Sequence, residues 1–162
     1  MPRVHYIRAR KDYPAESIRR GEMHYKWTTR PGGPGSRGIV HRSPRPPQAW
    51  ELTSSPFLQT AYQIEHALQQ FEVDTFDPDS DVSDIVQQIE DLRDEAQSSL
   101  DNMPEGLQEN SASGQMLQER IDSCEQWIAD IENIDFEEWD DLEEDSDRQV
   151  LLDDLGQCGF PG

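Results

Sequence analysis

Residues 81–134 read DVSDIVQQIEDLRDEAQSSLDNMPEGLQENSASGQMLQERIDSCEQWIADIENI, and this stretch decides the fold class. Apolar residues recur in it at steps of three and four, which is the spacing of one helix face. The first apolar stripe contains Ile85, Ile89, Leu92, Ala96, Leu100 and Met103, and the second contains Leu117, Ile121, Cys124, Ile128 and Ile131. Residues 104–114 separate the stripes and have the Pro/Gly content of a loop, with Ser113 as a candidate N-cap. We therefore predict an antiparallel, coiled-coil-like helical hairpin over residues 81–134.

A connector and a shorter amphipathic helix are predicted upstream, within residues 47–73. Pro44, Pro46 and Pro47 make the chain stiff and extended before this helix. Ser54 or Ser55 is expected to cap it, and the helix is expected to end near residue 72. Its apolar positions are Phe57, Leu58, Ala61, Ile64, Leu68 and Phe71. We expect this helix to dock beside the hairpin seam, where Trp127 flanks the second stripe.

Residues 1–46 have the pattern of a small basic β module. Residues 4–9, 23–30 and 38–42 are runs in which β-branched and aromatic side chains roughly alternate with polar ones. A tight turn is expected around Gly21, and residues 31–38 are expected to form a loop. The predicted fold class is α+β. A small three-stranded antiparallel sheet at the N-terminus is followed by a helix, the helical hairpin and an acidic tail over residues 135–162.

The charge of the chain is divided sharply along the sequence. Residues 1–46 hold 11 Lys and Arg against three Asp and Glu, which gives +8. Residues 47–162 hold three Arg against 31 Asp and Glu, which gives −28, and the two values sum to the formal net charge of −20. A charge division of this size reports on binding partners more than on the fold.

Composition excludes several classes of protein. Hydrophobic residues make up 33% of the 162 residues, too few for one large core along the whole chain. No apolar run approaches the roughly 18 residues of a membrane span, so no membrane partner is expected. The first residues lack the apolar segment of a secretory signal, and two cysteines are too few for a disulfide framework. A cytoplasmic location is therefore expected.

The basic N-terminal module has candidate residues for contact with single-stranded nucleic acid, in which cations follow phosphates and rings stack on bases. These candidates are Arg8, Arg10, His24, Tyr25, Lys26, Trp27, Arg30 and Arg42. In the alternative interpretation, Tyr25 and Trp27 form the small core of the module and its cations are only solvated. One histidine in each predicted strand, namely His5, His24 and His41, suggests a metal triad. No acid or cysteine is spaced with these histidines, and no metal is expected.

The acidic tail has candidate residues for binding a protein with a basic groove. Residues 135–147 include nine acids interleaved with aromatic and aliphatic side chains. The candidates are Phe136, Glu137, Glu138, Trp139, Asp140, Asp141 and Leu142. The alternative is a flexible, solubilising tail. A calcium loop formed by Asp74, Asp77, Asp79 and Asp81 would lack the glycine and the bidentate glutamate of an EF-hand.

No catalytic motif is present. The sequence has no zinc-protease motif, no CxxC pair, no phosphate-binding loop and no recognisable Ser/His/Asp grouping. Cys124 lies in the predicted seam with no basic neighbour, so we interpret it as a buried apolar residue. The chain is therefore expected to be a non-enzyme without cofactors.

Seven short strings together resemble a family of uncharacterised proteins from tailed phages and bacteria. They are KDYP at 11–14, IRRGE at 18–22, YKW at 25–27, LTSSPF at 52–57, RDEA at 93–96, NMPEGLQ at 102–108 and LQERI at 117–121. The resemblance spans most of residues 4–134. It implies a phage or prophage setting, and it implies no activity and no site residue.

These features predict a phage or prophage accessory binding protein that contacts proteins of nucleic-acid metabolism or host defence. In this interpretation the acidic helical body occupies a basic groove of a host or phage protein, as a DNA mimic does. One alternative is a nucleic-acid-binding accessory protein that uses the basic sheet. Another is a structural or assembly adaptor that forms a homodimer through the helical hairpin.

Overall fold

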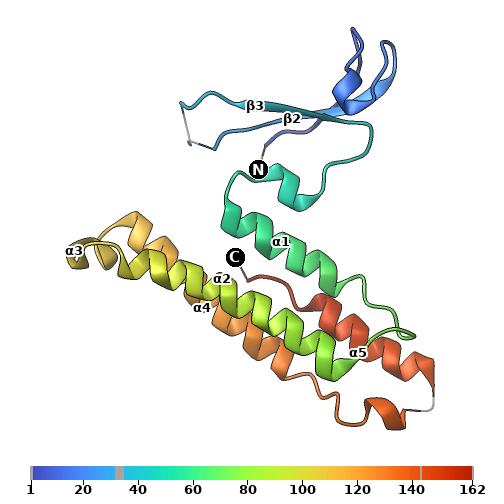
Figure 1. The fold of residues 1–162 in the computed structure, drawn as a ribbon, viewed down its shortest axis with the longest axis vertical. Helices are drawn as coiled ribbons and strands as arrows, with labels where there is room; N and C mark the ends of the chain where they lie inside the picture. Colours follow the sequence, from blue (N-terminus) through green and yellow to red (C-terminus); the bar gives the residue numbers. More distant parts are fainter. Residues whose placement is uncertain (1, 32–34, 143, 162) are drawn as a thin grey trace. The chain divides into compact units, whose positions relative to one another are not determined.

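The computed structural model describes residues 2–31, 35–142 and 144–161, and the chain divides into two compact units. Residues 1–60 form a sheet unit and residues 61–162 form a helical unit. A three-stranded sheet precedes the helices along the chain, which confirms the α+β prediction (Figure 1). None of the helices in the described ranges has both the length and the apolar character that a bilayer span requires.

The sheet has strand order β1-β2-β3 and is antiparallel throughout. Its strands are β1 (His5–Arg8), β2 (Met23–Thr29) and β3 (Ile39–Ser43). Tyr6 lies opposite Tyr25, and Trp27 lies opposite His41. An arm with the short helix η1 (Pro14–Glu16) connects β1 to β2 and ends in the predicted turn at Gly21. The φ angle of Gly21 is +94°, in the left-handed region that glycine tolerates best.

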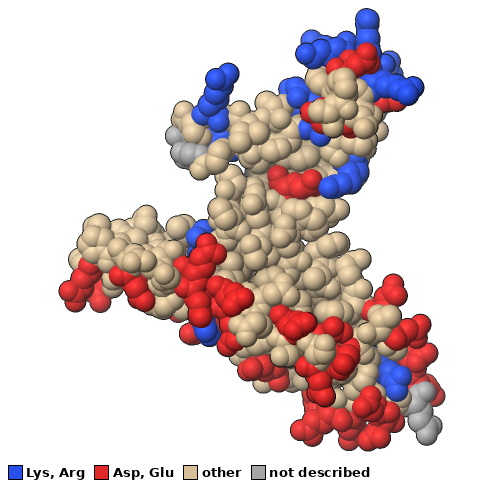
Figure 2. All heavy atoms as spheres, viewed as in Figure 1, with Lys and Arg blue, Asp and Glu red and all other residues tan. Residues whose placement is uncertain are grey.

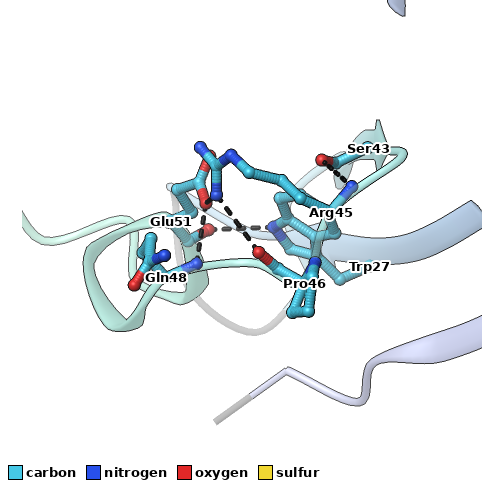
Figure 3. Close-up of polar contacts among 6 residues, drawn as sticks. All are labelled: Trp27, Ser43, Arg45, Pro46, Gln48 and Glu51. Atoms are coloured by element: carbon cyan, nitrogen blue, oxygen red, sulfur yellow. Dashed lines mark hydrogen bonds and ion pairs between the residues drawn. The ribbon is translucent and has the colours of Figure 1, made fainter.

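Trp27 is the core residue of the sheet unit and is 3% exposed. Its indole Nε1 donates a hydrogen bond of 2.9 Å to the backbone oxygen of Glu51 in η2 (Ala49–Leu52) (Figure 3). The Glu51 carboxylate accepts from the Gln48 amide at 2.7 Å and pairs with Arg45 at 2.8 Å. Burial raises the pKa of Glu51, but the hydrogen bonds from Arg45 and Gln48 outweigh burial and lower this pKa below its ordinary value. The proline-rich connector is therefore fixed against the sheet by polar contacts.

The predicted helical hairpin is present in the helical unit. Helices α2 (Ser83–Asp101) and α4 (Ala112–Glu132) pack against each other, and α3 (Glu105–Gln108) lies in the connection between them. Their buried seam contains Ile85, Ile89, Leu92, Ala96, Leu100, Leu117, Ile121, Cys124 and Ile131. Because the seam is filled within one chain, it does not by itself offer an interface for a second copy.

Two details of α4 differ from the prediction. Ser111 is the N-cap in place of Ser113, and its Oγ accepts from the Gly114 amide at 3.0 Å. A Cβ atom at position 114 would overlap the Gln108 carbonyl, so the start of α4 requires a glycine there.

Trp127 is fully buried, whereas Ile128 is only half-buried. The reason is that the Trp127 indole donates to the Cys158 carbonyl at 2.9 Å, which turns the ring toward the C-terminal segment.

The amphipathic helix α1 (Pro56–Leu68) ends four residues before the predicted position. The Ser55 Oγ accepts a long hydrogen bond of 3.5 Å from the Leu58 amide, consistent with the predicted cap. The next segment leads through η3 (Pro78–Val82) into α2. Phe76 in this segment is buried against aromatic rings of the C-terminal region.

The C-terminal region differs from the flexible tail that we predicted. It contains η4 (Trp139–Asp141) and the helix α5 (Asp145–Gln157). Leu152 and Leu155 are buried, and a Cβ atom at position 156 would lie 3.8 Å from the Leu68 carbonyl oxygen at the end of α1. The high charge of residues 135–147 indicated disorder, but the leucines that follow supply an apolar face that packs on the helical unit.

Candidate binding surfaces

The candidate nucleic-acid-binding residues do not share one face of the sheet. Trp27 is 3% exposed and His24 is 1% exposed, so neither ring is available for base stacking. Side chains alternate along a strand, which places Arg8 and Tyr25 on the face of Trp27, and Lys26 and Arg42 on the opposite face. Arg10 and Arg30 are exposed outside the strands. Trp27 therefore fits the alternative interpretation, in which it belongs to the core of the module, and the exposed candidates are divided between the two faces.

The face opposite Trp27 carries a row of three basic side chains. His5 lies opposite Lys26, which lies opposite Arg42. The Arg42 guanidinium lies 4.4 Å from the centroid of the Tyr13 ring, so it holds the β1–β2 arm by a cation–π contact. Arg42 Nε is buried and has no hydrogen-bond partner among the described residues. Because Arg42 packs on Tyr13 and its Nε is buried, its guanidinium is less accessible to a phosphate than that of an exposed arginine.

Tyr6 is the residue that sequence reasoning missed. It is 57% exposed and lies directly opposite the half-buried Tyr25, with ring centroids 4.7 Å apart and an interplanar angle of 38°. The exposed Arg8 follows two residues later on the same face. The two-residue alternation in residues 4–9 was the available signal, because it places Tyr6 and Arg8 on one side of β1.

The candidate protein-binding residues divide between the core and the surface. Trp139 is buried, and its ring centroid lies 5.1 Å from that of Phe76 and 6.1 Å from that of Phe136. This aromatic cluster anchors the C-terminal region, so Trp139 is not a free ligand for a partner. The acids Glu137, Glu138, Asp140 and Asp141 are exposed, and Leu142 is half-buried.

An apolar pocket with an acidic rim lies between residue 135 and α5. Its volume is about 300 Å³, and it is lined by Leu142, Val150, Leu151, Asp135, Glu138 and Asp147. Val150 is 57% exposed, so the pocket offers apolar surface to solvent. We call this set of six residues the acidic pocket.

The cation on α5 is directed toward the protein interior. Arg148 is the only Lys or Arg in residues 121–162. Its Nε donates to the Trp139 carbonyl at 3.2 Å, and its guanidinium lies 5.7 Å from the centroid of the Trp139 ring. The rim of the pocket therefore keeps its negative charge.

Glutamines support the carboxylates along the helices. Each of the following glutamines donates from Nε2 to an aspartate Oδ1 four residues later, at 2.7–3.1 Å: Gln87 to Asp91, Gln97 to Asp101, Gln118 to Asp122, Gln126 to Asp130 and Gln149 to Asp153. Such pairs stabilise a helix without cancelling charge. Arg93 pairs with Asp94 at 2.9 Å and with Glu90 at 4.0 Å. Figure 2 shows the resulting distribution, with Asp and Glu along the helical unit and most Lys and Arg on the sheet unit.

The described residues include no group of three or more His, Cys, Asp or Glu placed to share a metal ion. His41 lies on the Trp27 face, where its Nε2 is hydrogen-bonded to Thr29 Oγ1 at 2.8 Å, whereas His5 and His24 lie on the other face. In the suggested calcium loop, Asp77 Oδ1 accepts from the Asp79 amide, and Asp81 Oδ2 accepts from the Asp77 amide. These side chains are engaged in local folding.

The thiols have the properties of packed side chains. Burial raises the pKa of Cys124 to about 11, and burial also raises the pKa of Cys158. At neutral pH both are therefore protonated and poorly nucleophilic. Comparisons with protein-family models, curated proteins and solved structures gave no significant match.

Proposed function

We propose that the protein is a non-enzymatic accessory protein of a phage or prophage, active in the host cytoplasm. In this proposal its helical unit binds a basic surface of a partner protein of nucleic-acid metabolism or host defence. The observation that carries the proposal is the acidic pocket, which combines three aliphatic side chains, among them the largely exposed Val150, with three carboxylates. A partner that presents an apolar anchor between lysines or arginines fits this chemistry.

The charge of the whole helical unit supports the same partner chemistry. Residues 61–162 hold 30 Asp and Glu against three Arg, which gives −27. A field of this sign attracts a basic protein and speeds its association at low ionic strength. Because glutamines hold several carboxylates in place on α2, α4 and α5, the helices present an ordered anionic array of the kind that DNA mimicry requires. The adaptor alternative has less support, since the hairpin seam is already buried within the chain.

Affinity capture from the phage host, quantified by mass spectrometry, tests this proposal. Val150→Asp adds a charge to the pocket floor at a largely exposed position, so the fold should tolerate it. Met116→Asp is the matched control, because Met116 is 42% exposed on α4 and does not line the pocket. We expect wild type and Met116→Asp to retain a basic partner at 50 mM salt, and Val150→Asp to recover at least about fivefold less of it.

Competition separates mimicry from other modes of binding. If the helical unit occupies a nucleic-acid groove, then excess duplex DNA or heparin should displace the partner, and 0.3 M salt should weaken the complex. Equal recovery by Val150→Asp and wild type would contradict the assignment of the pocket. A partner with an acidic binding surface would contradict the proposed function itself.

A further inference from the structure

The open half of the sheet is an exposed surface that the proposed function does not use. On the Trp27 face, η2 covers the end that holds Trp27 and Thr29, and both side chains are buried. The other end of the same face holds Tyr6, Arg8, Met23 and Tyr25. Tyr6 and Met23 are both exposed large side chains, and Arg8, which lies opposite Met23, is also exposed. One face of the sheet is therefore divided into a packed half and an open half.

The open half has the geometry of a stacking platform. The Tyr6 and Tyr25 rings form a cross-strand pair whose centroids lie 4.7 Å apart, and much of Tyr6 is exposed to solvent. Stacking on such a ring is open to any base, because every base has a π-face. Arg8 stands next to this pair, where its guanidinium can contact a phosphate of a strand laid across the rings. The sheet unit as a whole carries 11 Lys and Arg against four Asp and Glu, a net charge of +7.

We propose that the Tyr6–Tyr25 pair and Arg8 form a binding site for single-stranded nucleic acid on the open half of the sheet. A single strand is favoured over a duplex because its bases are free to unstack onto the rings. This site would be distinct from the acidic pocket and would bind a ligand of opposite charge.

Fluorescence anisotropy with a labelled dT12 oligonucleotide and the full-length protein at 25 mM salt tests the site. The informative pair is Tyr6→Leu, which removes the ring, and Tyr6→Phe, which keeps it. We expect Tyr6→Leu to weaken binding by about tenfold, the effect of losing one base-stacking contact, and Tyr6→Phe to stay within about twofold of wild type. Because Tyr6 is 57% exposed, neither substitution should unfold the sheet unit, and circular dichroism of each variant checks this point.

A second pair of variants separates a local contact from general charge. Arg8→Gln should weaken binding and reduce the slope of log affinity against log salt by about 0.7, the value for one phosphate contact on a single strand. Arg19→Gln changes the charge by the same amount at an exposed position in the β1–β2 arm and should leave both quantities nearly unchanged. Photo-crosslinking of a bromodeoxyuridine oligonucleotide, followed by peptide mapping, should mark residues 5–8.

Three results would overturn the proposal. The first is that dT12 binds neither to wild type nor to a variant of lower negative charge, in which Asp140 and Asp141 are replaced by asparagine and Glu144 by glutamine. The second is equal binding of dT12 by Tyr6→Leu and wild type, which would indicate a purely electrostatic contact. The third is a Tyr6-dependent self-association without DNA binding, which would make the open half an interface between copies of the chain.

Discussion

Cys124 and Trp127 illustrate how single residues hold the helical unit together. They lie three residues apart on α4, so both are directed to the same side of the helix, and both are fully buried. Cys124 fills the seam with α2, and the Trp127 indole receives the C-terminal segment through its hydrogen bond to Cys158. Phe160 packs at 5.9 Å from the Trp127 ring. A thiol in this environment has a structural role.

Alkylation measures this burial at Cys124. The pKa of about 11 leaves well under 1% of the Cys124 thiol ionised at pH 8.5, so iodoacetamide should modify Cys158 first and Cys124 only after unfolding. Peptide mapping after timed labelling of native and urea-unfolded protein gives the two rates. Fast native labelling of Cys124 would show that the seam opens readily.

The same raised pKa also predicts a loss of stability in alkali. The unfolded chain releases the Cys124 proton near pH 9, and the folded chain holds it to about 11. Between these values the unfolded state binds fewer protons, so the free energy of unfolding falls as the pH rises. The Cys124→Ala variant should lose this part of the pH dependence.

Helix α5 is part of the core of the helical unit. Leu152 and Leu155 pack inward, Arg148 contacts Trp139, and the segment after the helix covers Trp127. Removal of residues 135–162 would therefore expose the core as well as remove charge. For this reason, neutralising exposed acids is a better test of the acidic region than truncation.

Urea unfolding followed by tryptophan fluorescence should show how much α5 contributes. Leu155→Ala should lower the free energy of unfolding by about 2–5 kcal/mol, because the site is buried and a cavity remains. Val150→Ala on the same helix should change it by less than about 0.5 kcal/mol, since Val150 is largely exposed. Similar small effects of both substitutions would mean that α5 is detached in solution.

Sequence reasoning succeeded for elements with a long regular pattern. The hairpin followed from eleven apolar positions at helical spacing, and the strands followed from alternation. It failed for α5 because the nine acids in residues 135–147 indicated disorder more strongly than Leu152 and Leu155 indicated a buried face. No local pattern shows that the segment after α5 packs on Trp127. It also did not single out Tyr6, since the sequence cannot tell which end of a sheet face η2 covers.

At the scale of the whole molecule, two units of opposite charge share one chain. The sheet unit carries +7 and the helical unit −27. Like charges within 8–10 Å repel at ordinary salt, so compaction of the helical unit is opposed by its own surface. Mild acidification or added salt relieves this opposition.

Thermal melting at different salt concentrations should reveal this repulsion. The melting temperature of the full chain should rise between 10 mM and 0.5 M NaCl, because screening weakens the repulsion among the acids. Replacing Gln87, Gln97, Gln118 and Gln126 by lysine would place one positive charge beside each partner aspartate. The four lysines should reduce the repulsion among the acids and so flatten the rise of the melting temperature with salt. A salt-independent melting temperature in the wild type would show that the acids lie too far apart to interact.

The Gln–Asp pairs on the helices have a colloidal consequence. A helix laced with Glu–Lys pairs offers both charges to a neighbouring molecule, so two such surfaces can bridge each other when crowded. In the Gln–Asp pairs the partner of the aspartate is neutral, so these pairs leave the negative charge of the helical unit uncancelled. Copies of the helical unit should therefore have a positive second virial coefficient and stay dispersed at high concentration, which frees the anionic surface to meet a basic protein.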